Sequence, residues 1–245
     1  FLFLQAYKLR WLMNLLLLSN STMKGEAYFT WALPHVRDFL PALGEDILFI
    51  PYAAVGFSYD DYTDQVNQAL SQINLQVKGI HQFSHAQEAL DKAQAILVGG
   101  GNTWQLLYLL QQQQLIKTIR QKVSQDIPYV GWSAGSNVAC ATIMTTNDMP
   151  VVQPGSFQAL HLVPFQINPH YTEALIPRHG GESRRQRIQE YIVLNKAYVV
   201  GLPEGSLLRI HGKSVVLAGR DAFLFRQGDE VQNIASGTQL DFLMQ

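Results

Sequence analysis

One short stretch constrains the fold of this chain more than any other. Residues 127 to 132 form an apolar run that predicts a buried strand, and a Gly-x-Ser-x-Gly pattern ends it at Gly131 to Gly135. The small residues that follow predict a helix. Such a strand-to-helix turn tolerates only small neighbours, here Gly131, Ala134 and Gly135, so that the side chain of Ser133 stands clear of the backbone. The pattern therefore predicts a nucleophile elbow, although the same five residues also occur by chance in ordinary loops.

Strand and helix patterns alternate through the first half of the chain. This alternation predicts an α/β fold with a mostly parallel sheet flanked by helices on both faces. The expected strands are 14–18, 47–52, 77–83, 95–98 and 127–132, and the expected helices are 28–43, 60–75, 85–92, 103–110 and 115–123.

The second half is less regular. It predicts a strand at 160–167, a helix at 180–195 and a strand at 198–202. Short apolar runs then follow, broken by turns near residues 211, 218 and 227, which predicts C-terminal antiparallel hairpins closing one side of the sheet.

The length of 245 residues and the 47% hydrophobic content suit one sizeable α/β domain. We expect that domain to span 13–245, because no linker or repeat interrupts it. Residues 1–12 precede Met13, a plausible natural start, and we treat them as an extension. They are too short and too interrupted by charge for a membrane span, and they lack the order of a secretory signal.

Charge and cysteine content narrow the possible partners. The net charge of -1 gives no electrostatic basis for binding nucleic acid or a membrane surface. The single cysteine, Cys140, cannot form an internal disulfide and suits a reducing compartment, so we expect a cytoplasmic protein.

No cluster of histidines and carboxylates has metal-ligand spacing, and we expect neither a metal nor another cofactor. We expect a monomer or a small homo-oligomer.

A serine nucleophile needs a base, usually a histidine held by a carboxylate. Of the seven histidines, His170 stands out because it ends a predicted strand that leaves the core through Pro169. Functional side chains in α/β sheets gather at such strand ends. Two carboxylates compete to orient it: Asp148 in a polar loop and Glu204 after a strand. Spacing does not choose between them.

A glycine run, 99–101, follows the predicted strand at 95–98. Glycines at a strand end let the backbone approach a ligand and present N–H groups, so Gly100 or Gly101 could form an oxyanion hole together with the amide of Ala134. A phosphate cradle and a simple tight turn are the alternatives. The run matches neither a dinucleotide-binding fingerprint nor a P-loop.

Five motifs in order carry a family resemblance. They are Gly99-Gly100-Gly101-Asn102-Thr103, Gly131-Trp132-Ser133-Ala134-Gly135, Thr145-Thr146-Asn147-Asp148-Met149-Pro150, Ile167-Asn168-Pro169-His170 and Gly201-Leu202-Pro203-Glu204-Gly205. From Met13 to about residue 228 the chain resembles the peptidase E family of α-aspartyl dipeptidases. The segment 1–12 has no counterpart there, and the residues after 228 match loosely.

The resemblance implies a flavodoxin-like sheet similar to that of class I glutamine amidotransferases, with serine in place of their cysteine. It implies Ser133 as nucleophile and His170 as general base. Asp148 is the carboxylate traditionally assigned in this family, whereas Glu204 follows a strand end facing the same rim. Both stay candidates. The implied substrates are dipeptides with an unblocked N-terminal aspartate, cleaved through an aspartyl-enzyme ester.

Recognition of an acidic side chain calls for a cation with planar, bidentate geometry, which favours arginine. Arg184 and Arg187 lie three residues apart on a predicted helix and therefore share a face. They are the candidate substrate-binding residues, Arg184 first. The alternative is that both are ordinary solvated side chains.

Three rival functions stay open. The first is cyanophycinase-like hydrolysis of β-aspartyl-arginine, which needs a groove for a polymer. The second is an α/β-hydrolase esterase, whose chain order Ser133, Asp148 and His170 also fit. Against it, the interval from Ser133 to His170 is short and no His-Gly-Gly-Gly precedes the elbow. The third is a non-enzymatic scaffold, which would be expected to lack the nucleophile or the base, and neither is missing from this sequence.

Overall fold

The structure is a computed structural model that describes residues 13–40, 46–174 and 180–245. The extension 1–12, the end of the expected helix 28–43 and His179 lie outside the described residues. The strands are β1 (Asn14–Leu18), β2 (Ile47–Ile50), β3 (Lys78–Gly79), β4 (Ala95–Val98), β5 (Tyr129–Trp132), β6 (Gln166–Pro169), β7 (Val199–Leu202), β8 (Ser206–His211), β9 (Ser214–Gly219), β10 (Ala222–Phe225) and β11 (Gln232–Ile234). The α-helices are α2 (Leu33–Phe39), α3 (Tyr59–Leu70), α4 (Ala86–Lys92), α5 (Thr103–Gln112), α6 (Leu115–Ser124), α7 (Ala134–Val138) and α8 (Arg184–Leu194). Short 3-10 turns are η1 (Ser71–Ile73), η2 (Ile80–Gln82) and η3 (Asp241–Met244).

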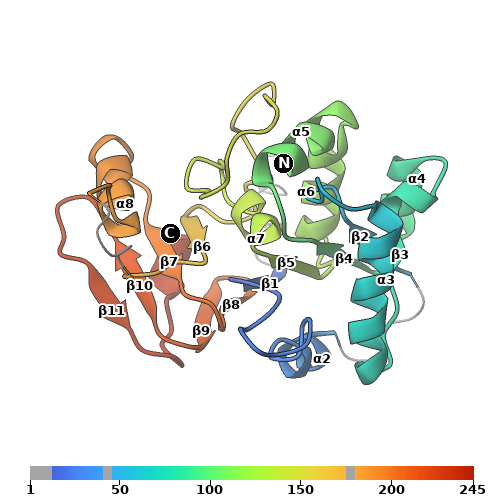
Figure 1. The fold of residues 1–245 in the computed structure, drawn as a ribbon, viewed down its shortest axis with the longest axis horizontal. Coiled ribbons are helices and arrows are strands. Elements are labelled where there is room, and N and C mark those ends of the chain that lie inside the picture. The colour runs from blue at the N-terminus through green and yellow to red at the C-terminus, as the bar shows by residue number, and fades with distance from the viewer. Residues whose placement is uncertain (1–12, 41–45, 175–179) are drawn as a thin grey trace, which may run out of the picture.

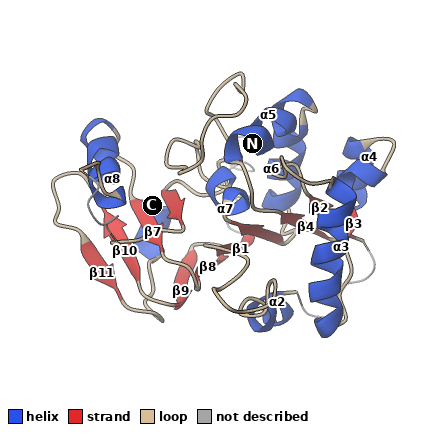
Figure 2. Ribbon diagram, in the orientation of Figure 1, coloured by secondary structure: helices blue, strands red, loops and turns tan. Residues whose placement is uncertain are grey.

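The strands form two sheets (Figure 1). The larger has seven strands in the order β3-β2-β4-β5-β1-β8-β9, and its first five strands run parallel. The antiparallel pair β8 and β9 closes one side, as the sequence predicts. The mostly parallel α/β fold is confirmed, with helices coloured blue and strands red in Figure 2.

The second sheet is a feature that the sequence pattern did not separate from the first. It has the order β11-β10-β7-β6, with β6 and β7 parallel and β10 and β11 antiparallel to their neighbours. It lies with α8 at the left of Figure 1, beside the larger sheet. The last hairpin therefore joins the second sheet instead of extending the first. The strand pattern alone does not predict which neighbouring strand each strand pairs with, since both sheets bury the same kinds of residue.

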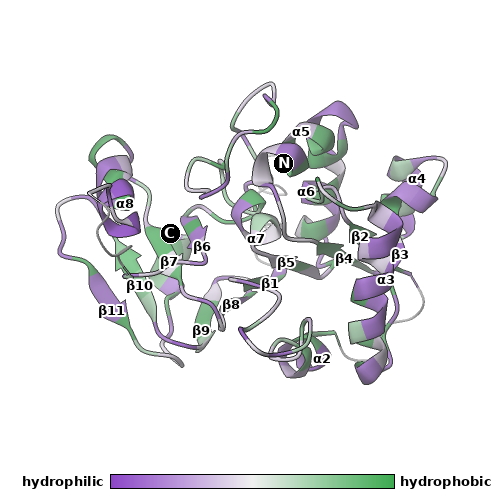
Figure 3. Cartoon of the chain, viewed as in Figure 1, coloured by the Kyte–Doolittle hydropathy of each residue, from purple (hydrophilic) through white to green (hydrophobic). Residues whose placement is uncertain are grey.

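Each central strand of the larger sheet supplies two hydrophobic cores. Successive side chains of a strand point to opposite faces. In β1, Leu15 and Leu17 pack into the core shared with α5, α6 and α7, whereas Leu16 and Leu18 pack into the core shared with α2 and α3. A sheet buried on both faces needs strands that are apolar throughout, and the sequences of these central strands have that composition. Figure 3 shows the complementary helix pattern, because hydrophilic and hydrophobic bands alternate along α3.

Several expected elements are shorter in the structure, and three of them show the physical reason. The expected strand 160–167 is a buried loop up to β6, because Leu160 and Leu162 donate backbone hydrogen bonds to Val138 and Ala139 at the end of α7. The expected helix 28–43 begins only at Leu33, since Phe29 has a φ of 66° that no helix contains. The strand expected at 77–83 turns into η2 after Gly79. Apolar content predicted the burial of these segments but not their hydrogen bonding.

Within the three described ranges, no helix combines the length and the apolar character needed to cross a membrane.

Candidate active site

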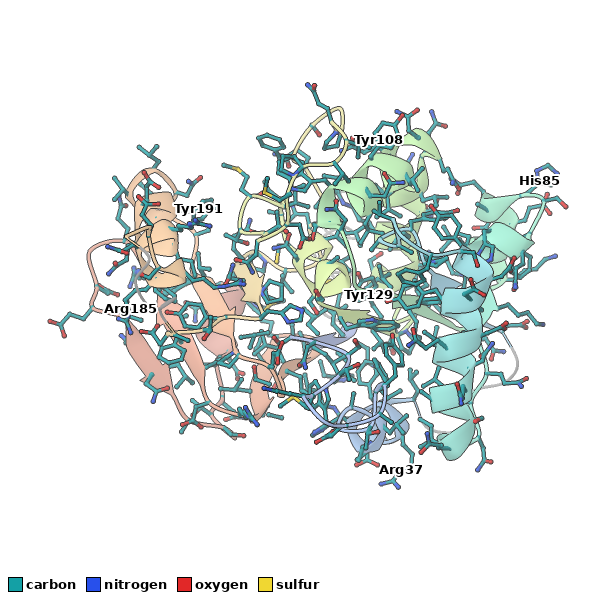
Figure 4. All side chains as sticks on the ribbon, viewed as in Figure 1. Arg37, His85, Tyr108, Tyr129, Arg185 and Tyr191 are labelled. Carbon is teal, nitrogen blue, oxygen red and sulfur yellow. The ribbon has the colours of Figure 1, made fainter. Side chains whose placement is uncertain are left out.

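Ser133 occupies the turn between β5 and α7, and its backbone adopts φ 53° and ψ -112°. A positive φ at a residue other than glycine is strained and persists only where the surroundings enforce it. The flanking glycines leave no room for a side chain: a Cβ on Gly131 would lie 2.5 Å from the Gly135 oxygen, and one on Gly135 would lie 2.2 Å from the Val98 oxygen. Tyr129 lies in the interior close to α7 (Figure 4), and its hydroxyl donates a 2.7 Å hydrogen bond to the Gly135 oxygen.

His170 reaches Ser133 from the other sheet. The Nε2 atom of His170 lies 2.9 Å from the Oγ of Ser133, within hydrogen-bond distance. His170 comes directly after β6 and has a φ of 52°. Its amide donates to the buried hydroxyl of Ser19, which follows β1. The strained backbone therefore turns the imidazole back from the second sheet toward the end of β5 in the first.

Glu204 supports the other side of the same imidazole. Its Oε1 lies 3.0 Å from the Nδ1 of His170. Strands β6 and β7 run parallel, and Pro169 is paired with Leu202, so the residues just beyond both strand ends emerge side by side. The carboxylate can accept a hydrogen bond from the Nδ1–H group, which fixes the tautomer in which the Nε2 lone pair accepts the hydroxyl hydrogen bond of Ser133.

Asp148, the other candidate for this role, lies elsewhere. Its Oδ2 accepts hydrogen bonds from the amide of Thr103 at 2.8 Å, from the hydroxyl of Thr103 at 2.6 Å and from the hydroxyl of Thr146 at 3.1 Å. Thr103 is the first residue of α5, where free N–H groups favour a negative charge. Of the two carboxylates, the structure therefore brings Glu204 and not Asp148 to His170.

The glycine run lies against the serine. A Cβ on Gly100 would be 3.0 Å from the Cβ of Ser133, so the absence of a side chain permits this close approach. Gly101 has a φ of 132°, and a Cβ there would lie 2.3 Å from the Ala53 oxygen. On the other side, Ala134 opens α7, and the first amides of a helix have no acceptor within it. The backbone of the glycine run and the start of α7 thus both border Ser133.

Arg184 opens α8 and faces the same region. Its pKa is lowered chiefly by burial and next by the charge of Arg187, while the charges of Asp148 and Glu204 raise it. Its Nη1 is shielded from solvent and has no hydrogen-bond partner among the described residues. Arg187 is 69% exposed and approaches Glu182 at 3.9 Å, so it lies toward solvent. The structure therefore separates the two candidate arginines: Arg184 is half-buried near both carboxylates, and Arg187 is on the surface.

Two contributors to this arrangement were missed by sequence reasoning. Ser19 anchors the backbone of His170, and the hydroxyl of Tyr62 on α3 donates a 3.0 Å hydrogen bond to the Gly100 oxygen. The signal for Ser19 is its position directly after a buried strand. Tyr62 reads as an ordinary apolar position of an amphipathic helix, and no local pattern distinguishes it.

Comparison with known proteins decides the family. The model of peptidase family S51 matches residues 15–218, which include every residue placed at the site above.

The chain belongs to peptidase family S51.

Relatives agree with this assignment. The S51 peptidase described here is 48% identical over 234 residues to a Nostoc sp. protein named Peptidase E, covering 95% of this chain and 97% of that one. It is 44% identical over 227 residues to Peptidase E of Salmonella arizonae, covering 92% of this chain and 99% of the relative. Family membership shows a serine peptidase of the S51 type, which is a hydrolase.

Solved structures show the same fold. A crystal structure from Listeria monocytogenes EGD-e, assigned as a candidate peptidase E protein, has a TM-score of 0.64 and 26% identity, covering 85% of this S51 peptidase and 98% of that chain. A peptidase from an acI-B1 Actinobacterium has a TM-score of 0.65 at 16% identity, covering 96% and 99% of the two chains.

Within the described residues no group of three or more histidine, cysteine or acidic side chains could hold a metal ion.

Proposed function

We propose that this S51 peptidase hydrolyses dipeptides that carry a free N-terminal aspartate, through an aspartyl ester on Ser133. The relatives from Nostoc and Salmonella bear the name Peptidase E, the family that the sequence motifs resemble. The observation that carries the proposal is Arg184, whose shielded Nη1 lacks a partner among the described residues and whose pKa is raised by the nearby charges of Asp148 and Glu204, although burial lowers it more. A buried, unpaired donor of this kind suits the carboxylate of an aspartyl substrate.

The chemistry begins at Ser133. Its Oγ attacks the carbonyl carbon of the Asp-X peptide bond while Nε2 of His170 takes the hydroxyl proton. Glu204 holds Nδ1 of the imidazole and stabilises the positive charge that forms on the ring. The carbonyl oxygen becomes an anion, stabilised by the amide of Ala134 together with that of Gly100 or Gly101.

The intermediate then collapses. His170 returns the proton to the leaving nitrogen, the C–N bond breaks and the second amino acid departs. A water molecule then attacks the aspartyl ester, giving its proton to His170 and its oxygen to the aspartate product. Ser133 recovers its hydroxyl proton from His170 as the ester bond breaks. The reaction consumes one water and needs no further reactant.

A substrate panel tests the specificity. We expect cleavage of Asp-Leu, and much slower cleavage of Asn-Leu, acetyl-Asp-Leu, p-nitrophenyl butyrate and cyanophycin. Cleavage of the butyrate ester without cleavage of Asp-Leu would favour an esterase, and cleavage of cyanophycin would favour a β-aspartyl peptidase. Either result would refute the proposal.

Variants of the arginines test the substrate contact. Arg184→Met should raise KM for Asp-Leu by about 10- to 100-fold, because a hydrogen bond to a charged group contributes about 1.5–3 kcal/mol. Arg187→Met should raise KM less, since that side chain lies toward solvent. Arg226→Met is the matched control, because Arg226 stacks on Tyr198. An unchanged KM in Arg184→Met would remove this residue from the site.

A further inference from the structure

The glycine run beside Ser133 offers two uncommitted amides. The amide of Gly99 donates to the Ile50 oxygen at 3.1 Å, and the amide of Asn102 donates to the Ala53 oxygen at 2.8 Å. Among the described residues, the amides of Gly100 and Gly101 have no hydrogen-bond acceptor. The two bonded ends fix the segment in place and leave the middle peptide to be oriented by something else.

A peptide between two glycines is poorly oriented by its own chain. Neither Gly100 nor Gly101 has a Cβ to exclude alternative backbone angles, so rotation of the connecting peptide meets little local resistance. Because that peptide is trans, its C=O and N–H point in opposite directions. Whatever holds the Gly100 oxygen therefore also sets the direction of the Gly101 N–H.

Tyr62 holds that oxygen. Its hydroxyl donates a 3.0 Å hydrogen bond to the oxygen of Gly100. The indole N–H of Trp132 is a donor only and lies 3.0 Å from the hydroxyl oxygen of Tyr62, so the tyrosine accepts from the indole and directs its own proton to Gly100. Burial raises the pKa of Tyr62 to about 12, so the hydroxyl keeps its proton at neutral pH.

Tyr62, Trp132 and Gly100 form a continuous chain of contacts beside Ser133. Trp132 directly precedes Ser133, and a Cβ on Gly100 would lie 3.0 Å from both the Cδ1 of Trp132 and the Cβ of Ser133. Tyr62 is 4% exposed and packs edge-on against Phe49, with ring centroids 5.0 Å apart. The hydrogen bonds run from the residue before the serine, through a rigid buried ring, to the peptide beside the serine.

We infer that Tyr62 is a positioning residue, which locks the Gly100–Gly101 peptide so that the N–H of Gly101 is presented to the oxyanion formed at Ser133. Tyr62 touches no substrate and acts through the backbone. The inference rests on the proposed role of Ser133 but not on the aspartyl specificity. Without the Tyr62 hydrogen bond, the amide of Gly101 is still present but can turn away from the oxyanion. The transition state then loses more stabilisation than the bound substrate does.

Tyr62→Phe is the direct test, because it keeps the buried ring and removes only the hydroxyl. Loss of an entire oxyanion donor typically costs about 10²- to 10³-fold in rate, so loss of its orientation should lower kcat by about 10- to 100-fold. KM for Asp-Leu should stay within about twofold, since ground-state contacts are unchanged. Tyr52→Phe is the matched control: Tyr52 is also buried, and its hydroxyl donates to Gln113.

A fluorophosphonate separates this inference from the substrate proposal. Oγ of Ser133 would form a bond to phosphorus, fluoride would leave and His170 would take the proton, which places the phosphoryl oxygen where the oxyanion would lie. The labelling rate in Tyr62→Phe should fall by the same factor as kcat. No labelling of the wild-type protein would refute the role of Ser133 itself, whereas equal labelling of folded Tyr62→Phe and wild type would overturn the inference alone.

A second variant covers the case in which Tyr62→Phe does not fold. Replacement of Tyr62 by p-aminophenylalanine keeps a donor at the same place, and labelling should stay within about threefold of wild type because the lock to Gly100 is retained. A folded protein with this replacement that is labelled about 100-fold more slowly would also contradict the inference. Circular dichroism establishes folding in each variant.

Discussion

The hydroxyl of Ser19 accepts a 2.9 Å hydrogen bond from the backbone amide of His170 and donates a 2.7 Å bond to the Leu202 oxygen. Ser19 is fully buried and follows β1 of the larger sheet, whereas His170 follows β6 and Leu202 ends β7 of the second sheet. One hydroxyl thus ties the two sheets together at the point where the imidazole must meet Ser133. The strained φ of His170 is held from outside its own strand.

Ser19→Ala should therefore impair both stability and catalysis. The His170 amide would lose its buried acceptor, at a cost of about 1–3 kcal/mol in the free energy of unfolding. We expect kcat to fall by about 10- to 100-fold, because small misplacements of a catalytic group have effects of that size. Urea unfolding and kcat for Asp-Leu measure the two effects. Ser58→Ala, which removes the N-cap of α3, should lose stability but keep kcat. A wild-type kcat in Ser19→Ala would exclude the anchoring role.

Glu204→Gln should mainly impair catalysis, whereas Asp148→Asn should mainly impair stability. Glutamine can donate to Nδ1 of His170 and impose the wrong tautomer, so kcat should fall by about 10²- to 10⁴-fold. Asp148 instead accepts two hydrogen bonds from Thr103 at the start of α5 and a third from Thr146. Its replacement should cost about 1–3 kcal/mol of stability and lower kcat by less than the glutamate variant does. The comparison requires kcat and urea unfolding for both proteins. A larger loss of kcat in Asp148→Asn would return the orienting role to Asp148.

Gly135→Ala should disrupt the turn that carries Ser133. The added Cβ would lie 2.2 Å from the backbone oxygen of Val98, which cannot move without distorting β4. Overpacking of this kind typically costs about 1–3 kcal/mol, and here the contact is with backbone, so we expect the upper end or failure to fold. Gly56→Ala is the control, since nothing lies within 4 Å of its added Cβ. Thermal unfolding of the two variants gives the comparison, and equal midpoints would show that the turn adapts.

The buried thiol of Cys140 should react slowly in the folded protein, and its burial should make the free energy of unfolding fall at high pH. Burial raises the pKa of this thiol to about 12. An unfolded cysteine ionises near pH 8.5, so the folded state binds one more proton above that value. The stabilisation is thus present below about pH 8.5 and is lost as pH rises, by about 1 kcal/mol between pH 8 and pH 9.5. Urea unfolding of wild type and Cys140→Ala at both pH values isolates this effect.

Thiol labelling gives an independent check on Cys140. Native protein at pH 8 should react with iodoacetamide far more slowly than urea-unfolded protein, because the thiolate is the reactive form and the folded chain suppresses it. Rapid labelling of the native protein would show that the buried segment just after α7 opens readily.

Local patterns predicted the central sheet well, because strands such as β1 and β4 are apolar on both faces and glycines mark the turn at Ser133. The same reasoning failed for residues 160–165. That run is as apolar as a strand, yet its backbone bonds to the end of α7, and Arg120 donates to the Leu160 oxygen. Hydrophobicity reports burial, whereas a strand also requires a neighbouring strand with free backbone groups.

The candidate site shows the same division. Ser133 and His170 were predicted from motif and strand-end position, and the structure places their side chains within hydrogen-bond distance. Asp148 and Glu204 were indistinguishable in sequence, because each follows a plausible segment and neither spacing is decisive. Their separation depends on which sheet receives β7.

The amino-acid sequence alone determined the alternating α/β pattern, the small-residue turn around Ser133 and, through its motifs, membership of a peptidase family. These features are local, since side-chain periodicity and glycine geometry act over a few residues. Only the tertiary structure decided that Glu204 meets His170, that Asp148 holds α5 and that Ser19 and Tyr62 support the site. Those contacts join segments far apart in the chain, and strand order, not local pattern, sets which segments become neighbours.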